Sequence, residues 1–152
     1  MRDSNFEILE IFFGSEQYRA ALQLRREVLR FPLNLDYSLT DLIPDQVDHH
    51  LAAIDESKAL IGCLILARVS PQVLKMRQVA VAVPRQGRGI GIALVQAGEL
   101  WAIEHSYSSF ILNARESAVR FYTRLGYEKI GDRFVEVSIP HFKMRKNLAR
   151  QS

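Results

Sequence analysis

The sequence predicts an α/β or α+β fold, with helices around a mixed β-sheet, on three observations. Apolar runs of strand length alternate with segments whose apolar residues recur every three or four positions. A glycine-rich loop separates one such strand from the helix that follows it. The length of 152 residues, with 48% hydrophobic and 24% charged residues, is typical of a single globular domain, residues 1–152, and excludes a disordered chain.

The first elements expected are a strand and a helix. Residues 6–13 form a β-rich apolar run that stops at Gly14, and Ser15 is a favoured helix N-cap. The helical periodicity that follows extends to Phe31, where Pro32 disfavours helical geometry in the residue before it.

The middle of the chain predicts an irregular segment and then three strands. Residues 33–48 have the composition of a long loop or a broken second helix. Residues 50–55 and 60–69 predict a hairpin, and 73–83 a third strand of the meander. The remaining predicted elements are the glycine loop 84–91, a helix to residue 105, a strand at 109–113, a helix at 116–125 ended by Gly126, and strands within 127–130 and 134–147.

Charge and cysteine content limit the partners and the compartment. Twenty Lys and Arg against 17 Asp and Glu leave a net charge of +3, which permits an anionic ligand but is too small for a nucleic-acid footprint. The longest apolar run, 59–67, is far shorter than the roughly 20 residues that cross a bilayer. Its Cys63, the single cysteine, is predicted to be a core residue. With no secretory signal at the N-terminus, we expect a cytoplasmic protein without nucleic-acid or membrane partners.

The glycine loop, residues 86–91, stands where backbone N–H groups and the positive end of a helix can hold an anion. A P-loop needs Gly-Lys-Ser/Thr at the helix start, and this chain has Gly91-Ile-Ala. A dinucleotide fingerprint fails too, because Ile92 or Leu94 would have to be glycine or alanine. The pattern that fits is Gln/Arg-x-x-Gly-x-Gly/Ala, on Gln86, Gly89 and Gly91.

Residues 78–94, which include this loop, resemble the acetyl-CoA motif of the GNAT N-acetyltransferases. Residues 113–127 resemble the second GNAT motif, in which a tyrosine precedes a Leu-Gly-Phe/Tyr helix end. The resemblance covers nearly the whole chain, best from 74 to 147. It implies a GNAT fold: a central, mixed but mostly antiparallel sheet of six to seven strands with about four helices.

The resemblance also implies acetyl-CoA as co-substrate. Its pyrophosphate would meet the N–H groups of the glycine loop, with a charge-assisted contact from Arg88. The pantetheine arm and the thioester carbonyl would meet backbone groups of the fourth strand. The expected cofactor-binding residues are Val79, Ala80, Val81, Gln86, Gly87, Arg88, Gly89, Ile90, Gly91, Ile92 and Asn113.

Acetyl transfer to an amine needs a neutral nucleophile, donors to the oxyanion and an acid for the departing thiolate. The resemblance implies that Tyr122 is the acid. Many GNAT members carry a base glutamate on the fourth strand, where this chain has Gln78, so another group or water must serve. Residues 140–144, Pro-His-Phe-Lys-Met, resemble a segment of the subgroup that includes the glyphosate N-acetyltransferase type, in which the histidine is the base. His141 is therefore the candidate base, and an imidazole has a suitable pKa.

The same subgroup binds a small acidic substrate with arginines, which correspond here to Arg30, Arg77 and Arg115. Arg77 lies in a strand otherwise predicted to enter the core, where an unpaired charge is costly, so it should have an anionic partner. A planar guanidinium suits a carboxylate, phosphate or phosphonate and argues against a polycationic amine such as an aminoglycoside.

No metal site is predicted. His49 and His50 lie near Asp45 and Asp48, but adjacent histidines on a strand point to opposite faces.

The sequence therefore predicts an acetyl-CoA-dependent N-acetyltransferase that acts by direct attack of the primary or secondary amine of a small acidic substrate. Two alternatives are a protein N-terminal or lysine acetyltransferase and a non-catalytic acyl-CoA-binding domain of the same fold. The acceptor's identity, the choice between His141 and water as base, and the oligomeric state, a homodimer included, stay open.

Overall fold

The computed structural model describes residues 5–148. Its strands are β1 (Phe6–Ile11), β2 (His49–Asp55), β3 (Leu60–Ser70), β4 (Val73–Val81), β5 (Ser109–Arg115), β6 (Glu128–Lys129), β7 (Phe134–Glu136) and β8 (Ile139–Asn147). The strand order is β1-β2-β3-β4-β5-β8-β6, with β7 paired to β8. β4 and β5 are parallel. The β1–β2 and β2–β3 ladders are antiparallel, and so are the three ladders that β8 forms with β5, β6 and β7. The mixed, mostly antiparallel sheet predicted from the sequence is confirmed.

The described residues form two compact units. Unit 1 comprises residues 5–67 and 78–98, and unit 2 comprises 68–77 and 99–148. β3, β4 and helix α3 (Ile90–Glu104) contribute residues to both units.

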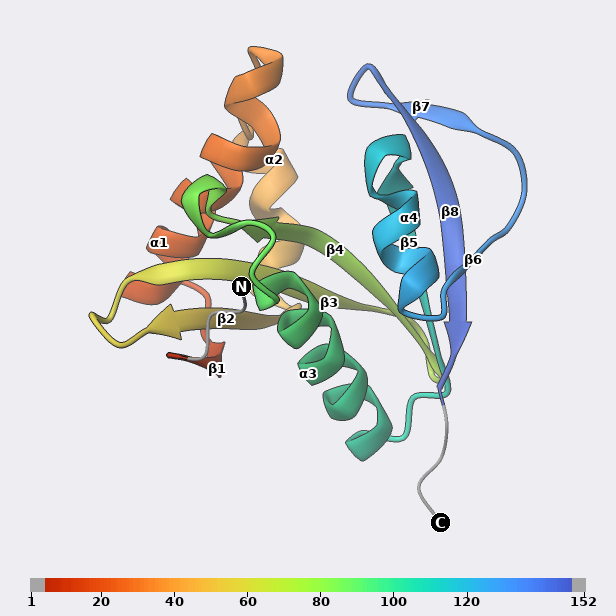
Figure 1. The fold of residues 1–152 in the computed structure, drawn as a ribbon, viewed down its shortest axis with the longest axis horizontal. Helices are drawn as coiled ribbons and strands as arrows, with labels where there is room; N and C mark the ends of the chain where they lie inside the picture. Colours follow the sequence, from red (N-terminus) through yellow and green to blue (C-terminus); the bar gives the residue numbers. More distant parts are fainter. Residues whose placement is uncertain (1–4, 149–152) are drawn as a thin grey trace. The chain divides into compact units, whose positions relative to one another are not determined.

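In unit 1, β1, β2 and β3 form an antiparallel meander (Figure 1). Phe6 on β1 lies opposite Asp55, and His49 on β2 lies opposite Leu66. β2 is buried from its second residue onward, so both of its faces are covered. Its four middle residues, Leu51 to Ile54, are accordingly all apolar instead of alternating with polar residues.

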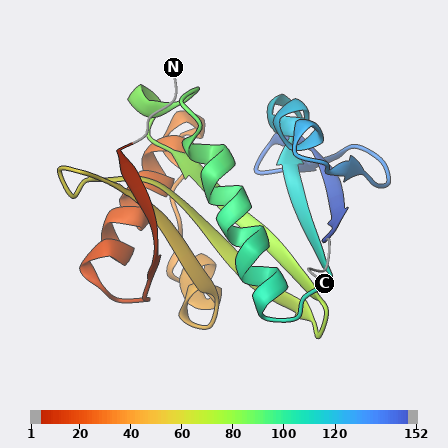
Figure 2. The same ribbon diagram turned by 60° about the horizontal axis from the view of Figure 1, so that its bottom comes forward.

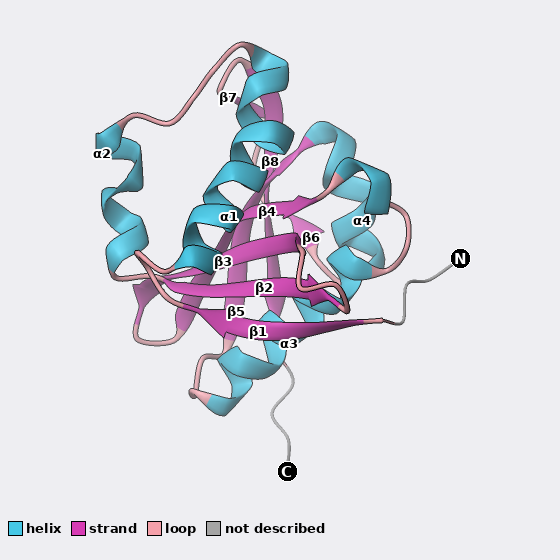
Figure 3. Cartoon of the chain, turned by 90° about the vertical axis from the view of Figure 1, so that its left-hand side faces the viewer, coloured by secondary structure: helices cyan, strands magenta, loops and turns pink. Residues whose placement is uncertain are grey.

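Two neighbouring residues of β3 contact helices on opposite faces of the strand, since successive side chains of a strand point to opposite sides. Gly62 faces α3, where an added Cβ would lie 2.9 Å from Leu94 and 3.0 Å from Ile90. Cys63 faces helix α1 (Glu16–Arg25), which lies across the strands of unit 1 in Figure 3. Its Sγ is 3.9 Å from the carbonyl oxygen of Ala21. Cys63 is 2% exposed, which confirms it as a core residue. Burial raises the pKa of its thiol to about 12.

Between α1 and β2 the chain folds into short helical turns. The sequence predicts one helix up to Phe31, but α1 ends at Arg25 and a π-helical turn, η1 (Arg26–Arg30), follows it. The other elements here are the 3₁₀ turn η2 (Phe31–Leu33), helix α2 (Leu39–Leu42) and the 3₁₀ turn η3 (Ile43–Gln46). Ser38 and Asp41 form a capping box that starts α2. Of the two predictions for residues 33–48, the broken second helix is therefore correct.

Unit 2 contains the parallel ladder of β4 with β5, the antiparallel ladders of β8, and helix α4 (Figure 2). β4 pairs with β5 from Val73 opposite Ser109 to Met76 opposite Leu112, and β5 pairs along its whole length with β8. The 3₁₀ turn η5 (Glu116–Ala118) leads into α4 (Val119–Arg124). Gly126 then has a φ of +94°, the left-handed conformation of a helix-ending glycine.

The strand structure predicted within residues 134–147 is confirmed, and a hairpin divides this segment into β7 and β8. Glu136 lies opposite Ile139, and the two residues between them, Val137 and Ser138, have φ values of +45° and +64°. Positive φ at both central positions is the type I′ hairpin turn, which normally uses Asn-Gly. A Val-Ser turn carries no such signal, which is why the sheet has eight strands instead of six to seven.

Replacing Val137 and Ser138 by Asn and Gly should stabilise the protein. The left-handed conformation costs an ordinary residue about 1–2 kcal/mol, and Asn-Gly relieves that cost. Urea unfolding should show a higher midpoint with an unchanged slope. The control is Val135→Asn, at an exposed position of β7, which should bring no gain; equal stability of the turn variant and the native chain would contradict the prediction.

Candidate functional site

The glycine loop joins β4 to α3 and is anchored at both sides. The Gln86 side chain donates a hydrogen bond to the Val81 carbonyl at 3.0 Å, and Arg85 pairs with Asp55 at 2.8 Å. Hydrogen bonds from Ser57, then from Ala59, together with the charge of Arg85, lower the pKa of Asp55. The loop is thereby fixed to the β2–β3 hairpin.

Two loop glycines adopt backbone conformations that other residues rarely reach. Gly87 and Gly89 have φ values of +78° and +88°, and α3 begins at the next residue, Ile90. α3 is 15 residues long and has no acidic side chain in its first turn. Its N-terminus therefore has free N–H groups and a positive end without a competing carboxylate, which suits a phosphate group. Arg88 is exposed in the same loop.

The fourth strand extends past its ladder with β5. The ladder ends at Met76, whereas β4 continues through Val79 and Ala80 to Val81. Ala80 is 3% exposed, so its side chain belongs to the core and only its backbone can serve a ligand. The carbonyl of Val81 already accepts a hydrogen bond from Gln86, which leaves it less able to accept one from a ligand.

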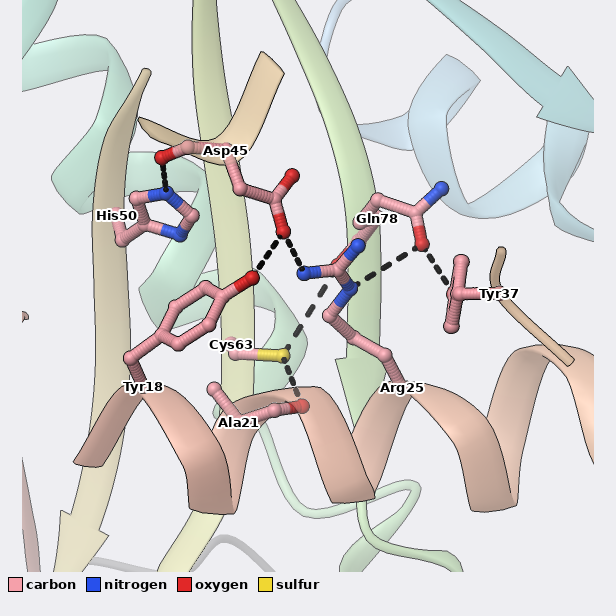
Figure 4. A network of polar contacts seen from close by, with 8 residues as sticks. All are labelled: Tyr18, Ala21, Arg25, Tyr37, Asp45, His50, Cys63 and Gln78. Carbon is pink, nitrogen blue, oxygen red and sulfur yellow. Dashed lines mark hydrogen bonds and ion pairs between the residues drawn. The ribbon is translucent and has the colours of Figure 1, made fainter. Parts of the chain in front are cut away.

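A buried ion pair organises the polar groups of unit 1 (Figure 4). Arg25 and Asp45 are 2.7 Å apart, with side chains 2% and 0% exposed. The same carboxylate oxygen accepts from the Tyr18 hydroxyl at 2.6 Å, and the Asp45 carbonyl contacts the ring of His50 at 2.9 Å. Burial, with Asp45 as hydrogen-bond acceptor and neighbouring charge, raises the pKa of Tyr18 to about 12.

Gln78 lies at the edge of this network, at a φ of +55°. Its Oε1 accepts from Arg25 Nε at 3.3 Å and, in a short hydrogen bond, from the Tyr37 hydroxyl. Arg30, one of the predicted substrate-binding arginines, is in unit 1 with its guanidinium 4.5 Å above the centre of the Tyr37 ring.

The candidate base lies in unit 2, in the β7–β8 hairpin. His141 is 3% exposed, and its Nδ1 is 2.8 Å from the Ile139 carbonyl. Since a carbonyl only accepts, Nδ1 carries the proton in the neutral ring and Nε2 has the free electron pair. Glu136 Oε2 is 3.5 Å from Nε2, and the other oxygen of Glu136 accepts from Asn113 at 3.4 Å.

Arg115 is the residue of β5 directly opposite His141. Directly opposite residues of an antiparallel pair share a face of the sheet, so the guanidinium and the imidazole emerge on one side. The hairpin adds Phe134, which is opposite His141 on β7 and packs against its ring with centroids 5.8 Å apart. His141, predicted from residues 140–144, is therefore brought together with Asn113 and Arg115, which lie on β5.

Tyr122, the candidate acid, lies on α4 in unit 2. It is 8% exposed and packs edge-on against Phe121 and Tyr127, with centroids 5.0 and 5.7 Å away. Burial raises the pKa of its phenol. The hydroxyl is accordingly protonated at neutral pH, as a proton donor must be.

The remaining predictions concern Arg77, metal ligands and membrane-spanning segments. Arg77 is half-buried and follows Met76, the last residue of the β4–β5 ladder. No group of three potential metal ligands occurs among residues 5–148, and His49 instead lies 3.3 Å from Glu10. No helix within that range is long and apolar enough to cross a membrane.

Sequence reasoning missed several residues of these clusters, among them Arg25, Tyr37 and Glu136. Glu136 lies in a hairpin whose turn residues carry no sequence signal. Tyr37 lies in residues 33–48, for which the sequence predicts either a loop or a broken helix, and an isolated tyrosine there carries no pattern.

Comparison with known proteins identifies the family. The model of the acetyltransferase (GNAT) domain matches residues 31–148. The chain belongs to the GNAT acetyltransferase family. The expected acetyl-CoA-dependent N-acetyltransferase activity, with acetyl-CoA as co-substrate, is thereby confirmed.

Individual relatives agree with this assignment. A UPF0039 protein of Schizosaccharomyces pombe is 30% identical over 151 residues, which cover 95% of this chain and 99% of that protein. The uncharacterized protein YyaT of Bacillus subtilis is 26% identical over 134 residues, covering 86% and 88%. The crystal structure of a putative N-acetyltransferase from Lactobacillus plantarum has the same fold, with a TM-score of 0.84, 22% identity and coverage of 96% and 100%.

Replacing Gly89 by Asp should weaken acetyl-CoA binding by about tenfold or more. The new side chain disfavours the positive φ and places a negative charge at the N-terminus of α3. Calorimetric titration of the folded variant provides the measurement. Gly131→Asp is the matched control, because Gly131 has a φ of +76° and open space around it but lies outside the loop. Unchanged affinity in the Gly89 variant would remove the loop from the binding site.

Proposed function

We propose that this enzyme acetylates the primary or secondary amine of a small substrate that carries an acidic group, by direct attack on the acetyl thioester. The observation that carries the proposal is the pairing of His141 with Arg115. An imidazole with a free electron pair on Nε2 and a guanidinium lie opposite each other on one face of β5 and β8. The first can remove a proton from an ammonium group, and the second suits an anion on the same molecule.

His141 is proposed as the general base. Its proton-accepting nitrogen, Nε2, lies 3.5 Å from Glu136 Oε2 and would take up the proton that the amine loses. A base of this kind contributes about 10²–10⁴-fold to the rate. Water as the base remains the competing assignment.

Tyr122 is proposed as the general acid. The departing thiolate needs a proton, and the phenol keeps its own at neutral pH because burial raises its pKa. Its ring is held in place by edge-on packing against Phe121 and Tyr127.

The glycine loop and β4 are proposed to hold the co-substrate, which supplies the activated acetyl group. Gly87 to Ile92 would bind the pyrophosphate through N–H groups at the start of α3, with Arg88 alongside. The backbone of Val79 to Val81, beyond the ladder with β5, would bind the pantetheine arm. Gln86 fixes the loop to Val81, and Asn113 is the remaining proposed contact.

The acidic substrate rests on the resemblance to the subgroup of the glyphosate N-acetyltransferase type and on its three arginines. Arg77 and Arg115 are both half-buried in unit 2, and Arg30 is half-buried in unit 1. Half-buried guanidinium groups are more effective toward an anion than solvated ones, because screening is weaker there.

We further propose that residues 1–152 form one acetyltransferase domain, since the matched residues 31–148 span both units. The buried free thiol of Cys63 is compatible with the reducing cytoplasm that the sequence predicts.

Replacing Tyr122 by Phe should lower kcat about 10²–10⁴-fold, because the ring packing stays and only the proton donor is lost. Thermal stability and acetyl-CoA affinity should hardly change. The contrasting variant is Tyr127→Phe, which removes the 2.8 Å hydrogen bond to Glu99 and should lower stability while leaving kcat intact. A Tyr122 variant with native kcat, measured where chemistry limits the rate, would make this residue a core aromatic only.

Replacing His141 by Ala and Arg77 by Met should separate deprotonation from substrate binding. The His141 variant should lower the rate for every amine and flatten the pH profile near neutrality. The Arg77 variant should raise KM for acidic amines much more than for neutral ones. Native pH dependence in the first variant would assign the base role to water, and equal losses on both amine classes in the second would refute the acidic substrate.

A further inference from the structure

The carboxamide of Gln78 is held in one orientation. Its Oε1 accepts hydrogen bonds from both Tyr37 and Arg25, which fills the two electron pairs of that oxygen. The reversed amide would bring its N–H groups against two donors. Burial raises the pKa of the Tyr37 phenol, which keeps this hydroxyl a donor. The orientation of Gln78 is therefore fixed by chemistry.

This orientation directs Nε2 away from the network, as Figure 4 shows. Among the described residues, no acceptor lies within hydrogen-bond distance of Nε2. Gln78 is half-exposed, so a ligand can reach the amide. The result is an oriented N–H donor that the protein itself does not use.

Arg30 is connected to Gln78 through Tyr37, which both residues contact. Its guanidinium stacks on the same Tyr37 that holds Gln78 and donates a hydrogen bond to the Leu29 carbonyl at 3.1 Å. No carboxylate of the described residues lies within 4.0 Å of it. Hydrogen bonds from Ser38 in the capping box, and to a smaller extent the charge of Arg30, lower the pKa of Asp41.

The other nearby cation is already neutralised. Arg25 is paired with the fully buried Asp45 and serves to position Gln78. The positive charge available to a ligand at Gln78 is consequently that of Arg30. A glutamate at position 78 would instead offer a negative charge at this place.

We propose that Gln78 Nε2 and the Arg30 guanidinium together bind a carboxylate group of the acceptor, with Tyr37 and Arg25 as positioning residues. The inference rests on the proposed function and adds a specificity-determining residue to it. An amide N–H and a guanidinium fit the two oxygens of a carboxylate. The glutamine at position 78 thus has a binding role here, because its amide cannot act as a base.

The test uses a panel of L-amino acids and their α-carboxamides as acceptors. Gln78→Glu should raise KM for the amino acids about 10- to 100-fold and leave KM for the carboxamides within about twofold. Tyr37→Phe, which frees the amide to rotate, should raise KM for the amino acids by a smaller factor with kcat unchanged. Gln17→Glu, at an exposed position of α1, makes the same change in net charge and should have no effect.

A binding measurement separates failure of this inference from failure of the proposed function. Saturating amino acids should raise the Tm of the native chain and of Gln17→Glu but not that of Gln78→Glu. An equal rise in Gln78→Glu, or equal KM changes for acids and carboxamides, would overturn the subsite and leave the proposed function standing. A native enzyme that acetylates carboxamides and neither acetylates nor binds amino acids would overturn both the subsite and the acidic substrate.

Discussion

The buried ion pair of Arg25 and Asp45 is the interaction on which most of unit 1 depends. Burial works against the charge of Arg25, but the hydrogen bond and charge of Asp45 outweigh it and raise the pKa of the guanidinium. Removing one member of such a pair costs about 3–5 kcal/mol, because the other is left as an uncompensated buried charge. Arg25 also keeps one nitrogen, Nη2, buried without a hydrogen bond, a cost that the rest of the network must offset.

Four elements meet at this pair. Arg25 and Tyr18 come from α1, Asp45 from η3, His50 from β2 and Gln78 from β4. The position of residues 33–48 is therefore determined by a buried carboxylate far more than by their weak local helical tendency. α2 has only four residues, too few to be stable as an isolated helix. The short helical turns between α1 and β2 are in this way connected to the core of unit 1.

The sequence predicts best where a single physical requirement dictates residue type. Gly87 and Gly89 need positive φ before a helix, and Cys63 lies in an apolar run, so both were placed correctly. Predictions failed where long-range contacts decide. Arg25, the ion-pair partner of Asp45, lies 20 residues away in the chain, and periodicity gives no information on such pairings. Periodicity also gives no sign of the π-helical turn after α1. The turn at Val137 is missed for the opposite reason, since the positive φ of Val137 contradicts the preference of its own β-branched side chain.

The two-residue turn of the last hairpin sets the chemistry of His141 through its length. Glu136 and Phe134 lie on the same face as His141 only because β7 and β8 are in this register. Side chains alternate with a period of two, so inserting or deleting one residue in the turn would turn the whole of β7 over. The carboxylate would then face away from the imidazole while the strand still paired. A change of one residue in the length of this turn would therefore alter the surroundings of His141, whereas a substitution that keeps the turn at two residues would leave that face intact.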